Sequence, residues 1–166
     1  MSLEATKTAL PKAETDEFAG AQSPHVQFLT PVSDADDEYC VMRGTLPPGA
    51  IVPIHSHAER ETFYVLEGEV QGLRDDRWIT LRRNDIFDVP GGLKHAWRNI
   101  SDSPATMIVV ASMRLARFLR DAPRLPAGEA GAPAPEEVQR FLDFAQAYGY
   151  WMGSPEDNAA VGLSFG

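Results

Sequence analysis

The 166-residue sequence lacks the features that mark several classes of protein. Its one cysteine, Cys40, cannot form an internal disulfide or a paired-cysteine metal or redox site. No apolar run approaches the about 18 residues that a membrane-spanning helix needs, and the N-terminus lacks the apolar core of a secretory signal. We therefore expect a protein without membrane partners in a reducing, cytoplasmic setting, with Cys40 as a small buried hydrophobe.

Basic residues are also scarce, since 15 lysines and arginines face 24 acidic residues and leave a formal net charge of -9. An acidic surface repels phosphate backbones, so we expect no nucleic-acid partner. The densest basic stretch, residues 114–124, holds four arginines at the spacing of one helix face. The sequence also lacks a glycine-rich phosphate loop, a G-x-S-x-G motif and a Cys/His nucleophile pair.

Short apolar runs separated by turn residues fill the sequence from position 25 to position 112. Turn residues cluster between these runs, as in the Pro-Pro-Gly at 47–49 and the Pro-Gly-Gly at 90–92. Many short strands with no helical pattern between them predict an all-β barrel or sandwich. The predicted strands cover residues 26–30, 39–45, 51–57, 62–66, 70–74, 78–81, 86–89, 95–100 and 106–112.

The period of the pattern changes after residue 112. A short helix carrying Leu115 and Phe118 is expected to end before Pro123, and a Pro- and Gly-rich linker covers 122–135. Pro135 then begins a second helix, with Gly149 just after its end. The apolar cluster at 150–152 is expected to dock on the barrel or on a partner subunit. The predicted organisation is a flexible N-terminal arm (1–24), a barrel (25–113), and C-terminal helices with a tail (114–166).

Three of the four histidines lie between positions 55 and 95. His55 and His57 are two apart on a predicted strand, so their side chains leave the same face, and Glu61 follows after a short turn. His95 comes just after the Pro-Gly-Gly turn. Three imidazoles and a carboxylate suit one divalent transition metal (Fe, Mn, Ni, Co, Cu or Zn) and leave coordination positions open, as in catalytic sites. The fourth histidine, His25, is expected at an edge or in solvent.

Both segments resemble the two sequence motifs of the cupin superfamily. These are written G-x5-H-x-H-x3-E-x6-G and G-x5-P-x-G-x2-H-x3-N. The first is matched by Gly49, His55, His57, Glu61 and Gly68, and the second by Pro90, Gly92, His95 and Asn99. Asn84 replaces the first glycine of the second motif, and asparagine tolerates the left-handed conformation that this turn needs.

The resemblance implies a cupin double-stranded β-helix, a jelly-roll barrel, with a short C-terminal helical extension. In such a small single-domain cupin the metal ligands would be His55, His57, Glu61 and His95. The chain is similar to quercetin dioxygenase-like cupins, and its residues 148–155 resemble the Tyr-Gly…Gly-Pro tail that many of them carry. This implies an oxygenase that acts on a small, flat, electron-rich molecule, with Glu61 also serving as the catalytic base.

Strand alternation predicts the surroundings of the metal. Phe63 and Val65 should share the face of Glu61, Trp97 that of His95, and Ile51 that of His55. We therefore expect an apolar, aromatic substrate pocket lined by these four side chains. No basic side chain is expected to point inward, which disfavours a phosphorylated substrate.

Two alternatives to an oxygenase stay open at this point, because fold does not select reaction. One is a metal-assisted isomerase, decarboxylase or lyase acting on a small keto acid or sugar. The other is a cupin that binds a small ligand without catalysis. We also expect a homodimer, formed through an edge strand or a swapped terminal segment, with the N-terminal arm and the 148–152 cluster available for the contact.

Overall fold

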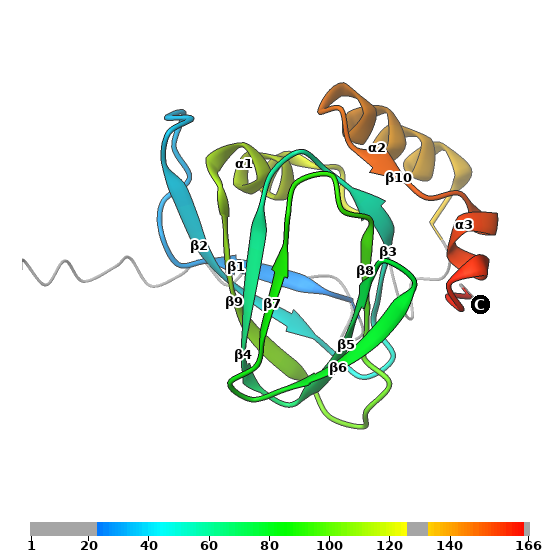
Figure 1. Cartoon of the computed structure of the whole chain (residues 1–166). Helices are drawn as coiled ribbons and strands as arrows, with labels where there is room; N and C mark the ends of the chain where they lie inside the picture. The colour runs from blue at the N-terminus through cyan, green and yellow to red at the C-terminus, as the bar shows by residue number, and fades with distance from the viewer. Residues whose placement is uncertain (1–22, 126–132, 165–166) are drawn as a thin grey trace, which may run out of the picture.

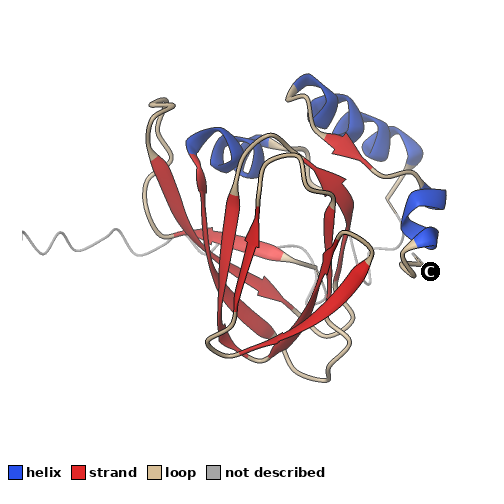
Figure 2. Cartoon of the chain, in the orientation of Figure 1, coloured by secondary structure: helices blue, strands red, loops and turns tan. Residues whose placement is uncertain are grey.

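The computed structural model describes residues 23–125 and 133–164 (Figure 1). The predicted N-terminal arm and the middle of the predicted linker lie almost entirely outside the described residues. Two five-stranded antiparallel sheets, in the orders β1-β2-β9-β4-β7 and β10-β3-β8-β5-β6, face each other and enclose the core (Figure 2). The strands are β1 His25–Phe28, β2 Tyr39–Leu46, β3 Ile51–Ser56, β4 Glu61–Glu67, β5 Glu69–Arg74, β6 Arg77–Arg82, β7 Ile86–Val89, β8 His95–Arg98, β9 Ala105–Ser112 and β10 Trp151–Met152.

The all-β prediction is confirmed, and each of the nine predicted strands is present with ends that differ by two residues or fewer. Alternation between buried and more exposed residues is clearest in β2 and β9, which pair along eight residues of each strand. The inward side chains of both sheets form one apolar cluster that includes Met42, Val65 and Met107. Cys40 belongs to this cluster and is fully buried, and burial raises the pKa of its thiol.

The turns of the barrel use residues suited to them. Asn84 adopts φ +75°, as expected for the residue that replaces glycine in the second motif, and its side-chain oxygen accepts a hydrogen bond from the Tyr64 hydroxyl at 2.8 Å. Asn99 is buried and donates to the carbonyl oxygens of Leu46 and Ser103, both at 2.8 Å. Asn99 therefore ties β8 to the end of β2 and closes the loop before β9.

Helix α1, Met113–Asp121, follows β9 directly. The Ser112 hydroxyl accepts the Leu115 backbone N–H, and Leu115 and Phe118 lie on the helix face that packs onto the barrel. Helix α2, Pro135–Ala147, begins at proline as predicted, and Gly149 adopts φ +75° just beyond its end. No helix among the described residues is long and apolar enough to span a membrane.

The segment after α2 returns to the barrel of the same chain. Strand β10 pairs with β3, with Trp151 opposite Ser56 and Met152 opposite His55. A short helix that the sequence pattern did not predict, α3 Pro155–Ala160, then covers the outer side of this sheet. Ser154 caps it by accepting the Asp157 N–H. The outer side carries a second, smaller apolar cluster, made of Ile54, Leu73, Ala96 and Leu163.

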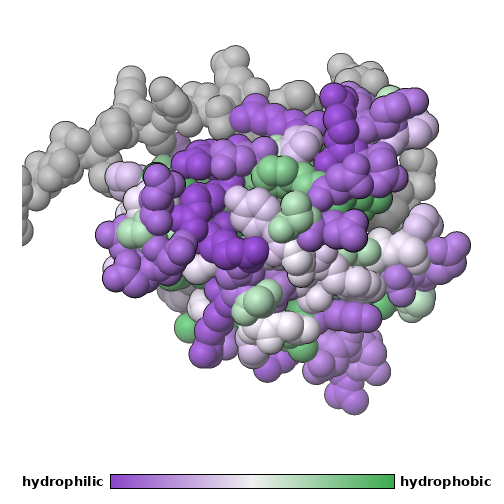
Figure 3. All heavy atoms as spheres, turned by 90° about the horizontal axis from the view of Figure 1, so that it is seen from above, coloured by the Kyte–Doolittle hydropathy of each residue, from purple (hydrophilic) through white to green (hydrophobic). Residues whose placement is uncertain are grey.

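Seen from above in Figure 3, the end of the barrel next to α1 and α2 is mainly hydrophilic, with a small group of apolar residues near its middle. Helices α1 and α2 lie at this end of the barrel, beside the strand ends, whereas α3 lies at its side and the opposite end consists of loops (Figure 1).

Gly68 and Gly49 provide a test of the packing of these turns. Both have φ near +80°, but a Cβ on Gly68 would lie 2.4 Å from the Pro104 carbonyl oxygen, whereas a Cβ on Gly49 would meet nothing within 4 Å. We expect Gly49→Ala to lower the free energy of unfolding by about 1 kcal/mol through backbone strain. Gly68→Ala should cost about 2 kcal/mol more because the loop before β9 must move. Equal losses in urea unfolding would contradict this account.

Candidate metal centre

Three histidines converge at one end of the barrel. One ring nitrogen from each of His55, His57 and His95 lies within 4.8 Å of the other two. His55 comes from β3 and faces His95, the first residue of β8, while His57 directly follows β3. The ring centroids of His55 and His95 are 4.2 Å apart, and those of His57 and His95 are 5.0 Å apart. Residues from the two sequence motifs are thus brought together by the pairing of β3 with β8.

Backbone carbonyls set the orientation of all three imidazoles. The Nδ1 atoms of His55, His57 and His95 lie 2.7, 2.9 and 2.9 Å from the carbonyl oxygens of residues 53, 59 and 93, respectively. Since a carbonyl only accepts hydrogen bonds, each Nδ1 carries a proton, and in the neutral ring each Nε2 then keeps its lone pair. This is the tautomer in which neutral histidine binds a metal through Nε2.

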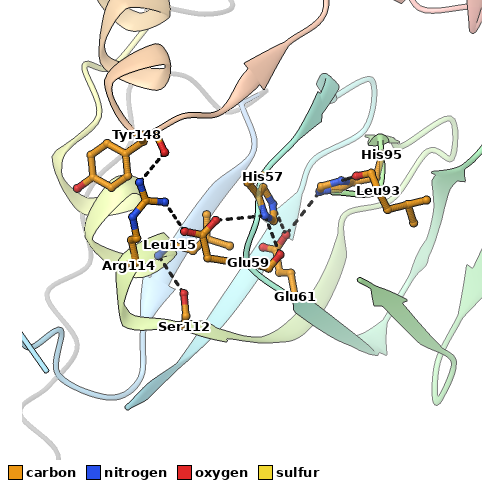
Figure 4. Close-up of polar contacts among 9 residues, drawn as sticks. All are labelled: His57, Glu59, Glu61, Leu93, His95, Ser112, Arg114, Leu115 and Tyr148. Atoms are coloured by element: carbon orange, nitrogen blue, oxygen red, sulfur yellow. Dashed lines mark hydrogen bonds and ion pairs between the residues drawn. The ribbon is translucent and has the colours of Figure 1, made fainter. Parts of the chain in front are cut away.

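Glu61, the first residue of β4, completes the set (Figure 4). Its Oε2 lies 3.4 Å from the Nε2 of His57 and 3.6 Å from the Nε2 of His95. The side chains of all three residues are almost completely buried. The four ligand residues expected from the cupin motifs therefore lie together, with the carboxylate on the His57 and His95 side.

Burial and neighbouring charge shift the protonation of this cluster. Burial lowers the pKa of His55 to about 3, and the nearby His95 adds to this effect. Burial opposes ionisation of Glu61, but contacts with His57 and His95 outweigh it and lower the pKa of its carboxyl to about 2. Burial alone would lower the pKa of His57, yet the Glu61 carboxylate outweighs it and raises that pKa. Glu61 is thus held ionised and His55 neutral, the forms that bind a metal.

The residues present fit a transition-metal ion. The Nε2 atoms of His57 and His95 are buried and have no hydrogen-bond partner. An unsatisfied buried polar atom typically costs about 1–3 kcal/mol, so two of them side by side indicate a site built for a ligand. Imidazole nitrogen and carboxylate oxygen are donors that iron, manganese, cobalt, nickel, copper and zinc all accept.

Phe63, Val65 and Trp97 point into the barrel interior next to the ligands, on the faces that alternation predicts. All three are buried in the main apolar cluster, and the rings of Phe63 and Trp97 have centroids 4.5 Å apart. Phe87 contacts Trp97 from the other side, with centroids 4.9 Å apart. The rings of Phe63, Phe87 and Trp97 form an aromatic layer in the barrel interior, in which Phe63 and Trp97 lie two residues along their strands from Glu61 and His95. A role of these side chains in substrate binding stays a prediction.

Ile51 lies on the other side of the sheet from His55. A register shift between Val52 and His55 places Val52 opposite Trp97 and Ile51 opposite Arg98. Ile51 accordingly packs against the outer apolar cluster, whereas Val52 packs against the main core. The irregularity adds one residue to β3 and reverses the simple alternation, so the expected position of Ile51 beside His55 is corrected to Val52.

A second group of polar residues lies behind His57 and was not identified from the sequence (Figure 4). The Glu59 carboxylate accepts a hydrogen bond from Arg114 of α1, and Arg114 also donates to the Tyr148 carbonyl oxygen. The Tyr150 ring packs on the His57 ring, with centroids 5.4 Å apart. No sequence motif links Glu59 with Arg114. The only feature of the sequence that pointed to this region was the apolar cluster at 150–152, which was expected to dock.

The acid sensitivity of the metal-free protein tests whether His55 is neutral in the folded chain. Its pKa is about 3 in the folded chain against an ordinary value of 6.5, so this group leaves stability unchanged above pH 6.5 and destabilises the fold as the pH falls toward 3. Protein stripped by a chelator should therefore lose about 1–2 kcal/mol of unfolding free energy between pH 7 and pH 5 through this group. His55→Gln should show a flatter dependence of unfolding free energy on pH in urea unfolding, and an unchanged dependence would exclude a lowered pKa of His55.

The comparisons with known proteins identify the barrel. Residues 42–111 match the model of the cupin domain family. A predicted oxalate decarboxylase from Thermotoga maritima shares 22% identity over 54% of this chain and 79% of its own, with a TM-score of 0.50, and supports the fold. None of the curated proteins matches significantly.

Two further solved structures share more sequence over shorter segments. A sugar phosphate isomerase of a cupin superfamily from Silicibacter pomeroyi is 29% identical over 46% of this chain, with a TM-score of 0.43. A DMSP lyase from Ruegeria pomeroyi is 27% identical over 46% of this chain, also with a TM-score of 0.43. The chain spans 51% of the length of the first and 39% of the second. With the motifs, the family match and the two-sheet barrel in agreement, residues 42–111 form a cupin domain, and the barrel is a cupin jelly roll.

Proposed function

We propose that this cupin is a metal-dependent enzyme that holds one divalent transition metal through His55, His57, His95 and Glu61. The observation that supports it most directly is the pair of buried Nε2 atoms, on His57 and His95, that have no hydrogen-bond partner beside an ionised carboxylate. A metal that accepts five or six ligands would keep open positions after these four residues bind it. A substrate can bind at such positions, which a closed structural site does not have.

In its more specific form, the proposal is an oxygenase acting on a small, flat, electron-rich organic molecule. A bound redox-active metal would promote the reaction of an enolate or phenolate with dioxygen. The aromatic layer of Phe63 and Trp97 favours a flat apolar substrate, since both rings lie next to the ligands within the barrel. No cation is among the residues that surround the ligands on the inner faces of β4 and β8.

Glu61 would have two roles in this proposal. The low pKa of its carboxyl suits a metal ligand rather than a strong base. A carboxylate that binds a metal through one oxygen keeps the other to accept the proton of a substrate hydroxyl, and ligation by the substrate would bring the two groups within reach. His57 and His95 flank the carboxylate and limit how far it can turn.

Substrate would approach from the side of His55. His57 and His95 are 4% and 1% exposed, whereas His55 is only partly buried. Strand β10 borders this side, because Met152 pairs with His55. The C-terminal segment therefore limits which molecules reach the ligands, and substrate size should depend on it.

Metal content is the first test. We expect close to one transition-metal ion per chain by plasma mass spectrometry of tag-free protein reconstituted under reducing conditions. His57→Ala should lose most of this metal because it removes one of the two buried Nε2 ligands, while His25→Gln, which changes a histidine on β1, should retain it. Equal metal content in both variants, or none in the wild type, would contradict the proposed site.

Dioxygen consumption then separates the oxygenase from the alternatives. Loaded protein should consume dioxygen with a flavonol, catechol or β-diketone, and His57→Ala should reduce the rate at least in proportion to its metal loss. Turnover of a keto acid or sugar that persists without oxygen would instead favour a lyase, decarboxylase or isomerase. Ligand-dependent melting shifts without chemical change would favour a binding protein.

A further inference from the structure

The loop that carries His57 is held from two sides. From one side, the Gly92 N–H donates to the His57 carbonyl oxygen at 2.7 Å, and Gly91 packs so closely that a Cβ there would lie 2.1 Å from the Ala58 carbonyl oxygen. From the other side, Arg114 bonds to the Glu59 carboxylate. The first contact belongs to the cupin motif turn, whereas the second comes from the C-terminal extension.

Glu59 contacts His57 twice. Its backbone carbonyl accepts the Nδ1–H of His57 at 2.9 Å, and its carboxylate Oε2 lies 3.8 Å from the same nitrogen. The Glu59 side chain is only 8% exposed. A carboxylate this buried needs a cation, and Arg114 provides it from the start of α1. The position of the Glu59 carbonyl, and with it the orientation of the His57 ring, therefore depends on Arg114.

Arg114 also holds the C-terminal segment. It donates to the Tyr148 carbonyl oxygen, and its guanidinium lies 5.0 Å from the centroid of the Tyr148 ring and 5.5 Å from that of Tyr150. Tyr150 in turn packs on His57. One side chain thus joins three elements, namely the His57 loop, helix α1 and the segment that leads into β10 (Figure 4).

We infer that Glu59 and Arg114 form a positioning pair that couples docking of residues 148–152 to the orientation of His57, and through it to the affinity of the site for a divalent metal. This inference rests on the proposed metal site. Partners that orient a metal-binding histidine typically contribute about 10- to 100-fold to affinity. Because binding couplings are reciprocal, metal should also tighten the docking of 148–152.

The test compares Arg114→Met with Arg117→Met. Arg117 lies one turn further along α1 and bonds to the Ser33 carbonyl oxygen and to Asp36, away from His57. Affinity for Co²⁺ and for Zn²⁺, measured by competition with a chelator, should fall about 10- to 100-fold in Arg114→Met. It should change by about twofold or less in Arg117→Met.

A second readout separates positioning from simple loss of stability. In the wild type, Zn²⁺ should slow amide hydrogen exchange at Tyr150–Met152, and this metal-dependent protection should disappear in Arg114→Met but persist in Arg117→Met. If Arg114→Met fails to fold, Arg114→Lys serves instead, because a lysine offers one point charge where the guanidinium bonds to two acceptors at once. The metal affinity of Arg114→Lys should then lie clearly below those of the wild type and the Arg117→Met control.

The outcomes distinguish this inference from the function on which it rests. Wild-type affinity and protection in Arg114→Met, or an equal loss in Arg117→Met, would overturn the positioning pair while leaving the metal site intact. A wild-type protein that binds neither Co²⁺ nor Zn²⁺ would overturn the proposed function, and the inference with it. Loss in Arg114→Met alone supports both.

Discussion

The close approach of the 90–92 turn to the 57–59 loop is the contact on which the metal centre depends. The Gly92 N–H bonds to the His57 carbonyl oxygen, and the missing side chain of Gly91 lets the two backbones meet. This contact joins a loop of the first cupin motif to a turn of the second, and β4, β5, β6 and β7 lie between these two segments in the chain. The pairing of β3 with β8 sets His95 opposite His55, and the contact between the turn and the loop keeps His57 beside both. Without it, the loop that carries His57 would lack its contact with the turn that precedes His95.

The centre has the character of a preorganised site. Each imidazole donates its Nδ1–H to a carbonyl within two residues of it, so the rings are already oriented before an ion binds, and for His57 the Arg114–Glu59 pair supports that carbonyl in turn. The Nε2 atoms of His57 and His95 are left without partners in the interior. Such unsatisfied groups persist only where the surrounding structure holds them firmly, and here the well-packed core of two sheets does so. Stability elsewhere in the barrel therefore supports a locally unfavourable arrangement.

The sequence predicted the strands and the ligands for different reasons. The strands follow from short apolar runs between turn residues. The turn at Asn84 follows from the tolerance of asparagine for positive φ. The ligands follow from motif spacing, which encodes the β3–β8 pairing. The irregularity in β3 has no local signal, so alternation placed Ile51 on the wrong face. Glu59 and Arg114 meet only through the tertiary fold, as do Tyr150 and His57. The predicted homodimer concerns a second chain and stays a prediction.

The two-residue strand β10 has a consequence for self-association. It occupies the outer edge of β3, a strand that carries Ile51, Val52 and Ile54. An apolar edge of this kind is a template for pairing with another chain, and natural proteins cover such edges or keep them very short. Here β10 covers the edge and is itself too short to pair with a strand of another chain. Pro53 also removes one backbone hydrogen-bond donor from β3. The C-terminal extension thus protects the barrel from edge-to-edge aggregation at the strand that carries a metal ligand.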